Sequence, residues 1–137
     1  ICFFLQGGHA RTARFAVNHL RKQGVKVGVA RLRFMRPFPT QAVAESLSKV
    51  KAVGTVETST SYGGASRGGN IIHEARTACY HLDNRPLITS FVAGLGGEIV
   101  TLNEFYAMAK VLSDSVKSGK VKDSYWMNFS EEVLDTH

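Results

Sequence analysis

Cysteine, proline and long apolar runs are all scarce in this chain of 137 residues. Its two cysteines, Cys2 and Cys79, are too few for a disulfide scaffold or for a zinc or iron–sulfur site built on cysteine alone. No apolar stretch approaches the roughly 18 residues that a membrane-spanning helix needs, so we expect no membrane partner. The sequence begins at Ile1, without an initiator methionine, a basic signal region or a cleavage site. We therefore expect a cytoplasmic piece of a longer protein.

Acidic residues are missing from residues 1–36, although this segment carries eight of the 17 lysines and arginines. Residues 37–137 hold nine basic and eleven acidic side chains, so the net charge of +6 originates in the amino-terminal segment. A phosphorylated ligand or an acidic protein surface could use this charge, and a solvated helix face beside a charged edge strand would explain it without any ligand. No basic motif interleaved with aromatic residues is present, so we expect no nucleic-acid partner.

Apolar runs and helical patterns alternate along the chain. The apolar runs predict strands over residues 1–5, 25–34, 52–57 and 87–93. The helical patterns predict helices over residues 12–23, 41–50, 70–81 and from Thr101 to about Lys117. This order predicts an α/β fold, a three-layer α/β/α sandwich with a mostly parallel sheet, over residues 1–118. A partly irregular tail is expected over residues 119–137.

Several residues have expected places within these elements. Phe15 is expected on the inner face of its helix, together with Val17 and Leu20. Thr40 is expected as the N-cap of the second helix. Thr101 and Glu104 have the spacing of a capping box, which predicts the start of the last helix.

Glycine-rich loops follow the first and last of the predicted strands, where ligands of open α/β sheets usually bind. Gly7 and Gly8, with His9 and Arg11, could contact an anion through backbone N–H groups at the start of a helix. The sequence lacks the GxGxxG and GxxxxGK[ST] spacings of nucleotide-binding loops, and tight turns alone would explain the glycines.

Other polar residues do not form a recognisable active site. His73 and Glu74 are adjacent on a predicted helix, so their side chains diverge and do not form a metal or acid–base pair. No serine lies in a Gly-x-Ser-x-Gly elbow, and both cysteines have the apolar surroundings of core residues. We therefore expect no catalytic residue and no metal site in this chain.

Three strings of the sequence carry a family resemblance. They are GVKVGVARLRFMRPFP, which ends in Arg36-Pro37-Phe38-Pro39, then KVKAVGTVETSTSYGGASRGGNIIHEA, and FVAGLGGEIVTLNEF, which contains Gly94, Gly96 and Gly97. Together they resemble the 2-oxoacid:ferredoxin oxidoreductases, and more narrowly the transketolase-C-like domain of the pyruvate:ferredoxin oxidoreductase α chain. The resemblance covers roughly residues 1–112. The chain departs from the family pattern at Glu98-Ile99, where Arg-Asp is usual, and at Asn70-Ile71, where Pro-Leu often follows the glycine.

The resemblance implies an enzyme that oxidatively decarboxylates a 2-oxoacid, with pyruvate as the default substrate. Thiamine diphosphate, Mg²⁺ and iron–sulfur clusters would serve the whole enzyme, ferredoxin or flavodoxin would accept the electrons, and coenzyme A would usually accept the acyl group. The resemblance further implies that this domain binds none of these cofactors. It would be a scaffold that packs against other domains or subunits of the same oligomeric oxidoreductase.

The Arg36–Pro39 motif has structural roles in this interpretation. Pro37 and Pro39 would turn the chain between strand and helix, Phe38 would anchor the turn, and Arg36 would bind a neighbouring carboxylate or backbone group. The alternative is an anion-binding or docking module, in which the basic segment holds a coenzyme phosphate or an acidic electron carrier.

Overall fold

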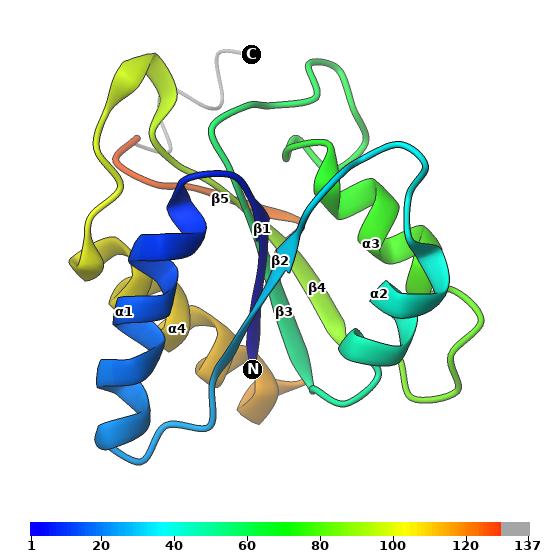
Figure 1. Cartoon of the computed structure of the whole chain (residues 1–137), viewed down its shortest axis with the longest axis horizontal. Coiled ribbons are helices and arrows are strands. Elements are labelled where there is room, and N and C mark those ends of the chain that lie inside the picture. Colours follow the sequence, from blue (N-terminus) through cyan, green and yellow to red (C-terminus); the bar gives the residue numbers. More distant parts are fainter. Residues whose placement is uncertain (130–137) are drawn as a thin grey trace.

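The computed structural model describes residues 1–129. The elements are β1 (Cys2–Gln6), α1 (His9–Lys22), β2 (Gly28–Leu32), α2 (Thr40–Leu47), β3 (Ala52–Glu57), α3 (Ile71–Cys79), β4 (Leu87–Val92), a short 3-10 turn η1 (Leu95–Gly97), α4 (Leu102–Ser118) and β5 (Ser124–Trp126). The strands form one parallel sheet in the order β2-β1-β3-β4-β5. In Figure 1, α1 and α4 cover one face of this sheet, and α2 and α3 cover the other. The predicted three-layer α/β/α sandwich is confirmed.

The sheet is buried on both faces because apolar side chains alternate along its central strands. In β1, Phe3 and Leu5 pack into the core layer beneath α1 and α4. Cys2 and Phe4, one position out of phase, pack into the layer beneath α2 and α3. β1 therefore contributes side chains to both core layers. A shift of one residue in its pairing would exchange the two sets of side chains, which fixes the register of the sheet. No helix within residues 1–129 combines the length and the apolar character needed to cross a membrane.

One expectation for α1 is wrong. Phe15 is 61% exposed, whereas the helix buries a stripe formed by Ala10, Ala13, Ala16, Val17 and Leu20. Residues 15 and 17 lie about 200° apart around a helix, so the two side chains cannot share one face. The small alanines on the buried stripe let α1 pack closely on the sheet, and the large aromatic ring of Phe15 remains in solvent.

The helix starts are partly as predicted. The capping box of Thr101 and Glu104 is present at the start of α4. Thr40, by contrast, is the first residue of α2, and Pro39 occupies the position that precedes the helix. The Thr40 hydroxyl donates to the carbonyl oxygen of Phe38 at 3.5 Å and caps no helical N–H group. The N-cap prediction for Thr40 is therefore wrong by one position.

The segment after α4 contains a strand that the sequence pattern did not reveal. β5 pairs in parallel with β4, with Tyr125 opposite Phe91. The approach to β5 is fixed by Thr89, whose hydroxyl donates to the carbonyl oxygen of Lys122 at 2.8 Å, and by an ion pair of 2.6 Å between Arg76 and Asp123. Three residues are too few to display a period of two, so the sequence pattern carries no signal for this strand. The rest of the expected tail, residues 130–137, lies outside the described residues.

Candidate functional site

The direction of winding reverses between β1 and β3. α1 follows β1 on one face of the sheet, and α3 follows β3 on the opposite face (Figure 1). The segments that leave the carboxyl ends of these two strands run to opposite faces of the sheet, and a crevice remains between them. Ligands of open α/β sheets bind in such a crevice. A cavity of about 540 Å³ opens at this point, and its lining includes Gly7, His9, Arg31, Arg33 and Glu57. We call it the switch-point cavity.

Glu57, at the end of β3, is the acidic residue of the switch-point cavity. Its two carboxylate oxygens accept hydrogen bonds from the backbone N–H groups of Asn70, at 3.0 Å, and Ile71, at 2.8 Å. Burial raises the pKa of this carboxyl above its ordinary value, and the two N–H groups oppose that shift. Glu57 therefore caps the start of α3 from the end of β3, and each of its oxygens accepts one backbone N–H group.

The loop of residues 58–70 is held against the sheet through its glycines. The N–H group of Gly69 donates to the hydroxyl of Ser90 at 3.1 Å, and a Cβ on Gly68 would lie 2.5 Å from the Cβ of Ser90. From β5, the indole N–H of Trp126 donates to the carbonyl oxygen of Arg67 at 2.9 Å. The loop resembles a phosphate-binding loop in composition, but its close approach to β4 is the reason for the buried glycines.

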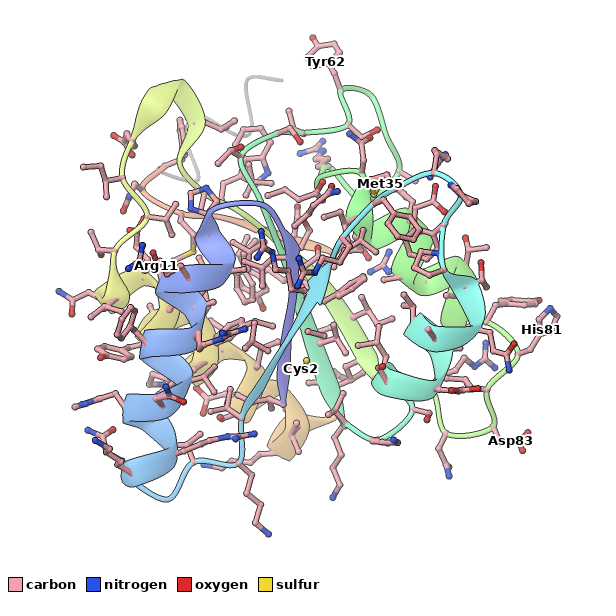
Figure 2. All side chains as sticks on the ribbon, in the orientation of Figure 1. Cys2, Arg11, Met35, Tyr62, His81 and Asp83 are labelled. Atoms are coloured by element: carbon pink, nitrogen blue, oxygen red, sulfur yellow. The ribbon has the colours of Figure 1, made fainter. Side chains whose placement is uncertain are left out.

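The residues predicted to contact an anion are divided between two hollows. Gly7 and His9 line the switch-point cavity. Arg11 lies in the first turn of α1, where Figure 2 labels it, and lines a separate hollow beside that helix. Gly8 is exposed between them. The structure thus brings Gly7, Gly8 and His9 together at the start of α1, and anion contact by these residues stays a prediction.

The Arg36–Pro39 motif lies between β2 and α2, outside the lining of the switch-point cavity. The guanidinium of Arg36 donates to the carbonyl oxygen of Met35 at 2.8 Å and to the carboxylate of Glu74 at 2.7 Å. The peptide bond before Pro37 is cis, and Phe38 packs against the core layer beneath α2 and α3. These contacts tie the loop after β2 to the first turn of α3.

The Gly94-Leu95-Gly96-Gly97 motif is a left-handed turn at the end of β4. Gly94, Gly96 and Gly97 have φ values of 76°, 72° and 85°, which residues with a side chain rarely adopt. A Cβ on Gly94 would also lie 3.0 Å from the carbonyl oxygen of Glu98. The motif therefore shapes the loop that leads to Ile99 and α4.

No catalytic arrangement is found among residues 1–129. Ser66 and His73 come within 3.4 Å of each other, but Ser66 is buried and its hydroxyl accepts the N–H group of Gly68. The same part of the chain brings no three His, Cys, Asp or Glu side chains together as metal ligands. Both cysteines are free and buried, and burial raises the pKa of the Cys2 thiol to about 11. A thiol with such a pKa is a weak nucleophile near neutral pH.

Comparison with known proteins decides the family. Residues 1–105 match the family described as pyruvate:ferredoxin oxidoreductase core domain II. The chain belongs to this family. The resemblance to the 2-oxoacid:ferredoxin oxidoreductases seen in the sequence is thereby confirmed.

Curated relatives agree with this assignment. The chain is 34% identical over 125 residues to ketoisovalerate oxidoreductase subunit VorA of Pyrococcus furiosus, a match that covers 90% of this chain and 31% of the relative. It is 32% identical over 135 residues to pyruvate synthase subunit PorA of Pyrococcus abyssi, covering 98% of this chain and 33% of the relative. The PorA subunit of Thermotoga maritima is 29% identical over 118 residues, covering 85% of this chain and 28% of the relative. The chain therefore spans about a third of the length of these relatives.

Within this family domain, the sequence pattern missed two features of the carboxyl edge. Glu57 gave no local signal, because the N–H groups that it caps lie 13 and 14 residues further along the chain. Arg31 was noted only as part of the basic segment, although it lines two hollows. The alternation of side chains along β2 could have indicated which face of the sheet the Arg31 side chain leaves. Arg31 pairs in register with Leu5, whose side chain faces α1.

Proposed function

We propose that this chain is a non-catalytic assembly domain of a thiamine-diphosphate-dependent 2-oxoacid:ferredoxin oxidoreductase. The whole enzyme would oxidatively decarboxylate a 2-oxoacid, usually to an acyl-CoA, and reduce ferredoxin or flavodoxin. Pyruvate is the expected substrate, and membership of the pyruvate:ferredoxin oxidoreductase core domain II family supports it. The similarity to a ketoisovalerate oxidoreductase subunit makes a branched 2-oxoacid the alternative substrate.

The described residues do not fit a thiamine diphosphate site. Such a site needs a divalent cation beside the diphosphate, held by oxygen ligands. Among the described residues, Glu57 is the one acidic side chain that lines the switch-point cavity, and its oxygens accept the N–H groups of Asn70 and Ile71 at the start of α3. Cys2 and Cys79 are likewise too few to ligate an iron–sulfur cluster. We therefore assign thiamine diphosphate, Mg²⁺ and the iron–sulfur clusters to other parts of the enzyme, and we assign no catalytic step to this domain.

The observation that carries the assembly role is the apolar character of the loop tips at the carboxyl edge. Phe34 follows β2 and is 53% exposed, Tyr62 follows β3 and is 91% exposed, and Ile99 follows β4 and is 83% exposed. Tyr62 projects from the outer tip of its loop in Figure 2. We call these three residues the apolar rim. Loop tips are usually polar, so large apolar side chains on three successive loops at one edge indicate a surface that another protein part covers.

The expected occupant of the apolar rim is the remainder of the same oxidoreductase. The relatives that this chain matches are about three times longer than the aligned segment, so additional protein is present in those subunits. Two of the loops that carry the rim are internally fixed: the loop of Tyr62 by the hydrogen bond from Trp126 to Arg67, and the loop of Ile99 by the left-handed turn of Gly94 to Gly97. Rigid loops with apolar tips favour a permanent contact within one enzyme over a transient encounter.

The proposal is tested by turnover of the intact enzyme that contains this chain. We expect pyruvate-dependent reduction of an electron-accepting dye, with 3-methyl-2-oxobutanoate as the competing substrate. The variants His9→Ala, Glu57→Gln and His73→Ala remove the titratable groups nearest the carboxyl edge. Each should leave turnover per assembled enzyme within about twofold of the unmodified protein, because none acts on the substrate. A general acid or base would cost roughly a hundredfold or more, and a loss of that size would contradict the non-catalytic role.

A further inference from the structure

A second hollow, of about 380 Å³, lies beside the one at the switch point. It is lined from α1 by Arg11, Arg14, Phe15 and Asn18, and from β2 by Arg31. Arg31 also lines the switch-point cavity, together with Arg33. We call the surface formed by Arg11, Arg14, Arg31 and Arg33 the arginine groove. It consists of two adjoining hollows that share one arginine.

The secondary structure brings these four arginines to one side. Residues 11 and 14 are three positions apart on α1, so their side chains lie on the same helix face. Arg31 lies near the end of β2 and Arg33 directly follows that strand, and both side chains line the switch-point cavity. Arg31 pairs with Leu5, which faces α1, so its side chain leaves the sheet on the side of α1 and joins Arg11 and Arg14 in the second hollow.

The four arginines form no ion pair within the described residues. None of their side chains makes a hydrogen bond or an ion pair within residues 1–129, and all four are exposed. Other arginines of the chain are engaged: Arg21 donates to the carbonyl oxygen of Val27 at 2.6 Å, and Arg36 binds Glu74. Glu57 lines the switch-point cavity with Arg31 and Arg33, but its carboxylate is hydrogen-bonded to the N–H groups of Asn70 and Ile71 and pairs with neither arginine. Among the residues that the structure describes, the groove therefore gathers four positive charges against the single carboxylate of Glu57.

We infer that the arginine groove binds a small molecule that carries two or more linked phosphate groups. Planar guanidinium groups bind phosphate oxygens in pairs, and several of them can neutralise a multiply charged anion. The volumes of the two hollows, about 380 and 540 Å³, lie in the range of small-ligand sites. A concave surface of this size suits a compact polyanion, because an acidic protein would meet a broader and flatter area.

Phe15 adds a second kind of contact to the groove. Its ring is 61% exposed and lines the same hollow as Arg11 and Arg14. An exposed ring beside guanidinium groups offers a face on which a nucleobase can stack. The shared chemistry of the ligand is the diphosphate, which a nucleotide or free pyrophosphate could supply. The inference does not depend on the assembly role, since the groove and the apolar rim are formed by different residues.

The test uses the intact protein and measures the chemical accessibility of each arginine of the groove separately. Phenylglyoxal modifies accessible arginines, and peptide mass spectrometry reports the modification at each one. We expect pyrophosphate and ADP to slow modification of Arg11, Arg14, Arg31 and Arg33, and to leave Arg85, which lies over the ring of Tyr80, unaffected. In the double variant Arg11→Gln/Arg31→Gln, the concentration of either probe that protects Arg14 and Arg33 should rise roughly tenfold or more. Because all the substituted side chains are exposed, these variants should fold normally.

The Phe15→Ala variant distinguishes the two sources of the diphosphate. It should weaken protection by ADP several-fold and leave protection by pyrophosphate unchanged if the ring stacks on a nucleobase. If the Phe15→Ala substitution leaves protection by ADP and protection by pyrophosphate equally unchanged, pyrophosphate itself is the sufficient ligand, which also supports the inference. Absence of protection by either probe would overturn it. Protection given only by an acidic partner protein would overturn it as well and would assign the groove to protein docking.

Discussion

The carboxylate of Glu57 occupies the space that a side chain on Gly69 would need. The same carboxylate accepts the N–H groups of Asn70 and Ile71, which follow directly in the chain. The end of β3 and the start of α3 are therefore joined by one partly buried contact that requires both an acid at position 57 and a glycine at position 69. This contact sets where the loop of residues 58–70 leaves the sheet, and hence where Tyr62 projects.

The Gly69→Ala variant should lower the free energy of unfolding by about 2 kcal/mol or more, because the added methyl group must displace the Glu57 carboxylate from its N–H partners. Gly8→Ala is the matched control: no atom lies within 4 Å of a Cβ at that position, and its φ of −66° suits any residue. It should change stability by no more than about 0.5 kcal/mol. Urea denaturation followed by the fluorescence of Trp126, the single tryptophan of this chain, measures both variants. Equal destabilisation by the two substitutions would contradict the contact.

Glu57 should also make stability depend on pH. Burial raises its pKa in the folded chain above the ordinary value, so folding favours the protonated form. The stability that protonation provides is present below the unfolded-state pKa and is lost as pH rises through the folded-state pKa. The Glu57→Gln variant cannot titrate, so the stability of the unmodified chain relative to this variant should fall as the pH rises from acidic to neutral. Denaturation of both proteins across that range measures the difference, and a difference that grows with pH would show that the pKa is lowered instead.

Cys2 should be unreactive in the folded chain. It is 7% exposed in the core layer beneath α2 and α3, and burial raises its pKa to about 11. Near neutral pH the thiolate, which is the form that reacts, is a minute fraction of such a thiol. Iodoacetamide should therefore label Cys2 after denaturation and leave it unlabelled beforehand, as read by peptide mass spectrometry. Rapid labelling of the native chain would mean that the strand opens or that the thiol is not buried.

The fold could be predicted from the sequence because its strongest patterns are local. The buried runs of β1, β3 and β4 are flanked by turn residues, and the Thr101–Glu104 capping box marks a helix start within four residues. β5 could not be predicted, since three residues carry no readable period and the strand depends on pairing with β4. The apolar character of Phe15 predicts a buried side chain, but the geometry of the helix places residue 15 on the exposed face.

The carboxyl edge was predictable only in part. Glycine-containing loops after β1 and β4 were readable as strand ends, because glycine interrupts an apolar run. The cap that Glu57 gives to α3, and the meeting of Arg11 with Arg31, join residues that are distant in sequence. Such contacts arise from the sheet order β2-β1-β3, which the sequence does not encode locally.

In the function proposed here, this domain assembles the enzyme and contributes no catalytic group. Assembly is assigned to the apolar rim, so polar substitutions there should reduce the amount of complex and not its chemistry. The variant Tyr62→Ser/Ile99→Ser alters two exposed loop tips at the carboxyl edge. Tyr80→Ser is the control, because Tyr80 is 65% exposed at the end of α3, on the opposite edge of the sheet. All three side chains are exposed, so neither variant should change the stability of the domain by more than about 0.5 kcal/mol.

The most direct measurement is the turnover of each assembled complex, separated by size and assayed by 2-oxoacid-dependent dye reduction. For Tyr62→Ser/Ile99→Ser we predict a reduced fraction of assembled enzyme whose turnover per complex equals that of the unmodified protein. The Tyr80→Ser control should show neither change. Full assembly with a turnover per complex reduced by roughly a hundredfold would place this edge in the chemistry and contradict the account.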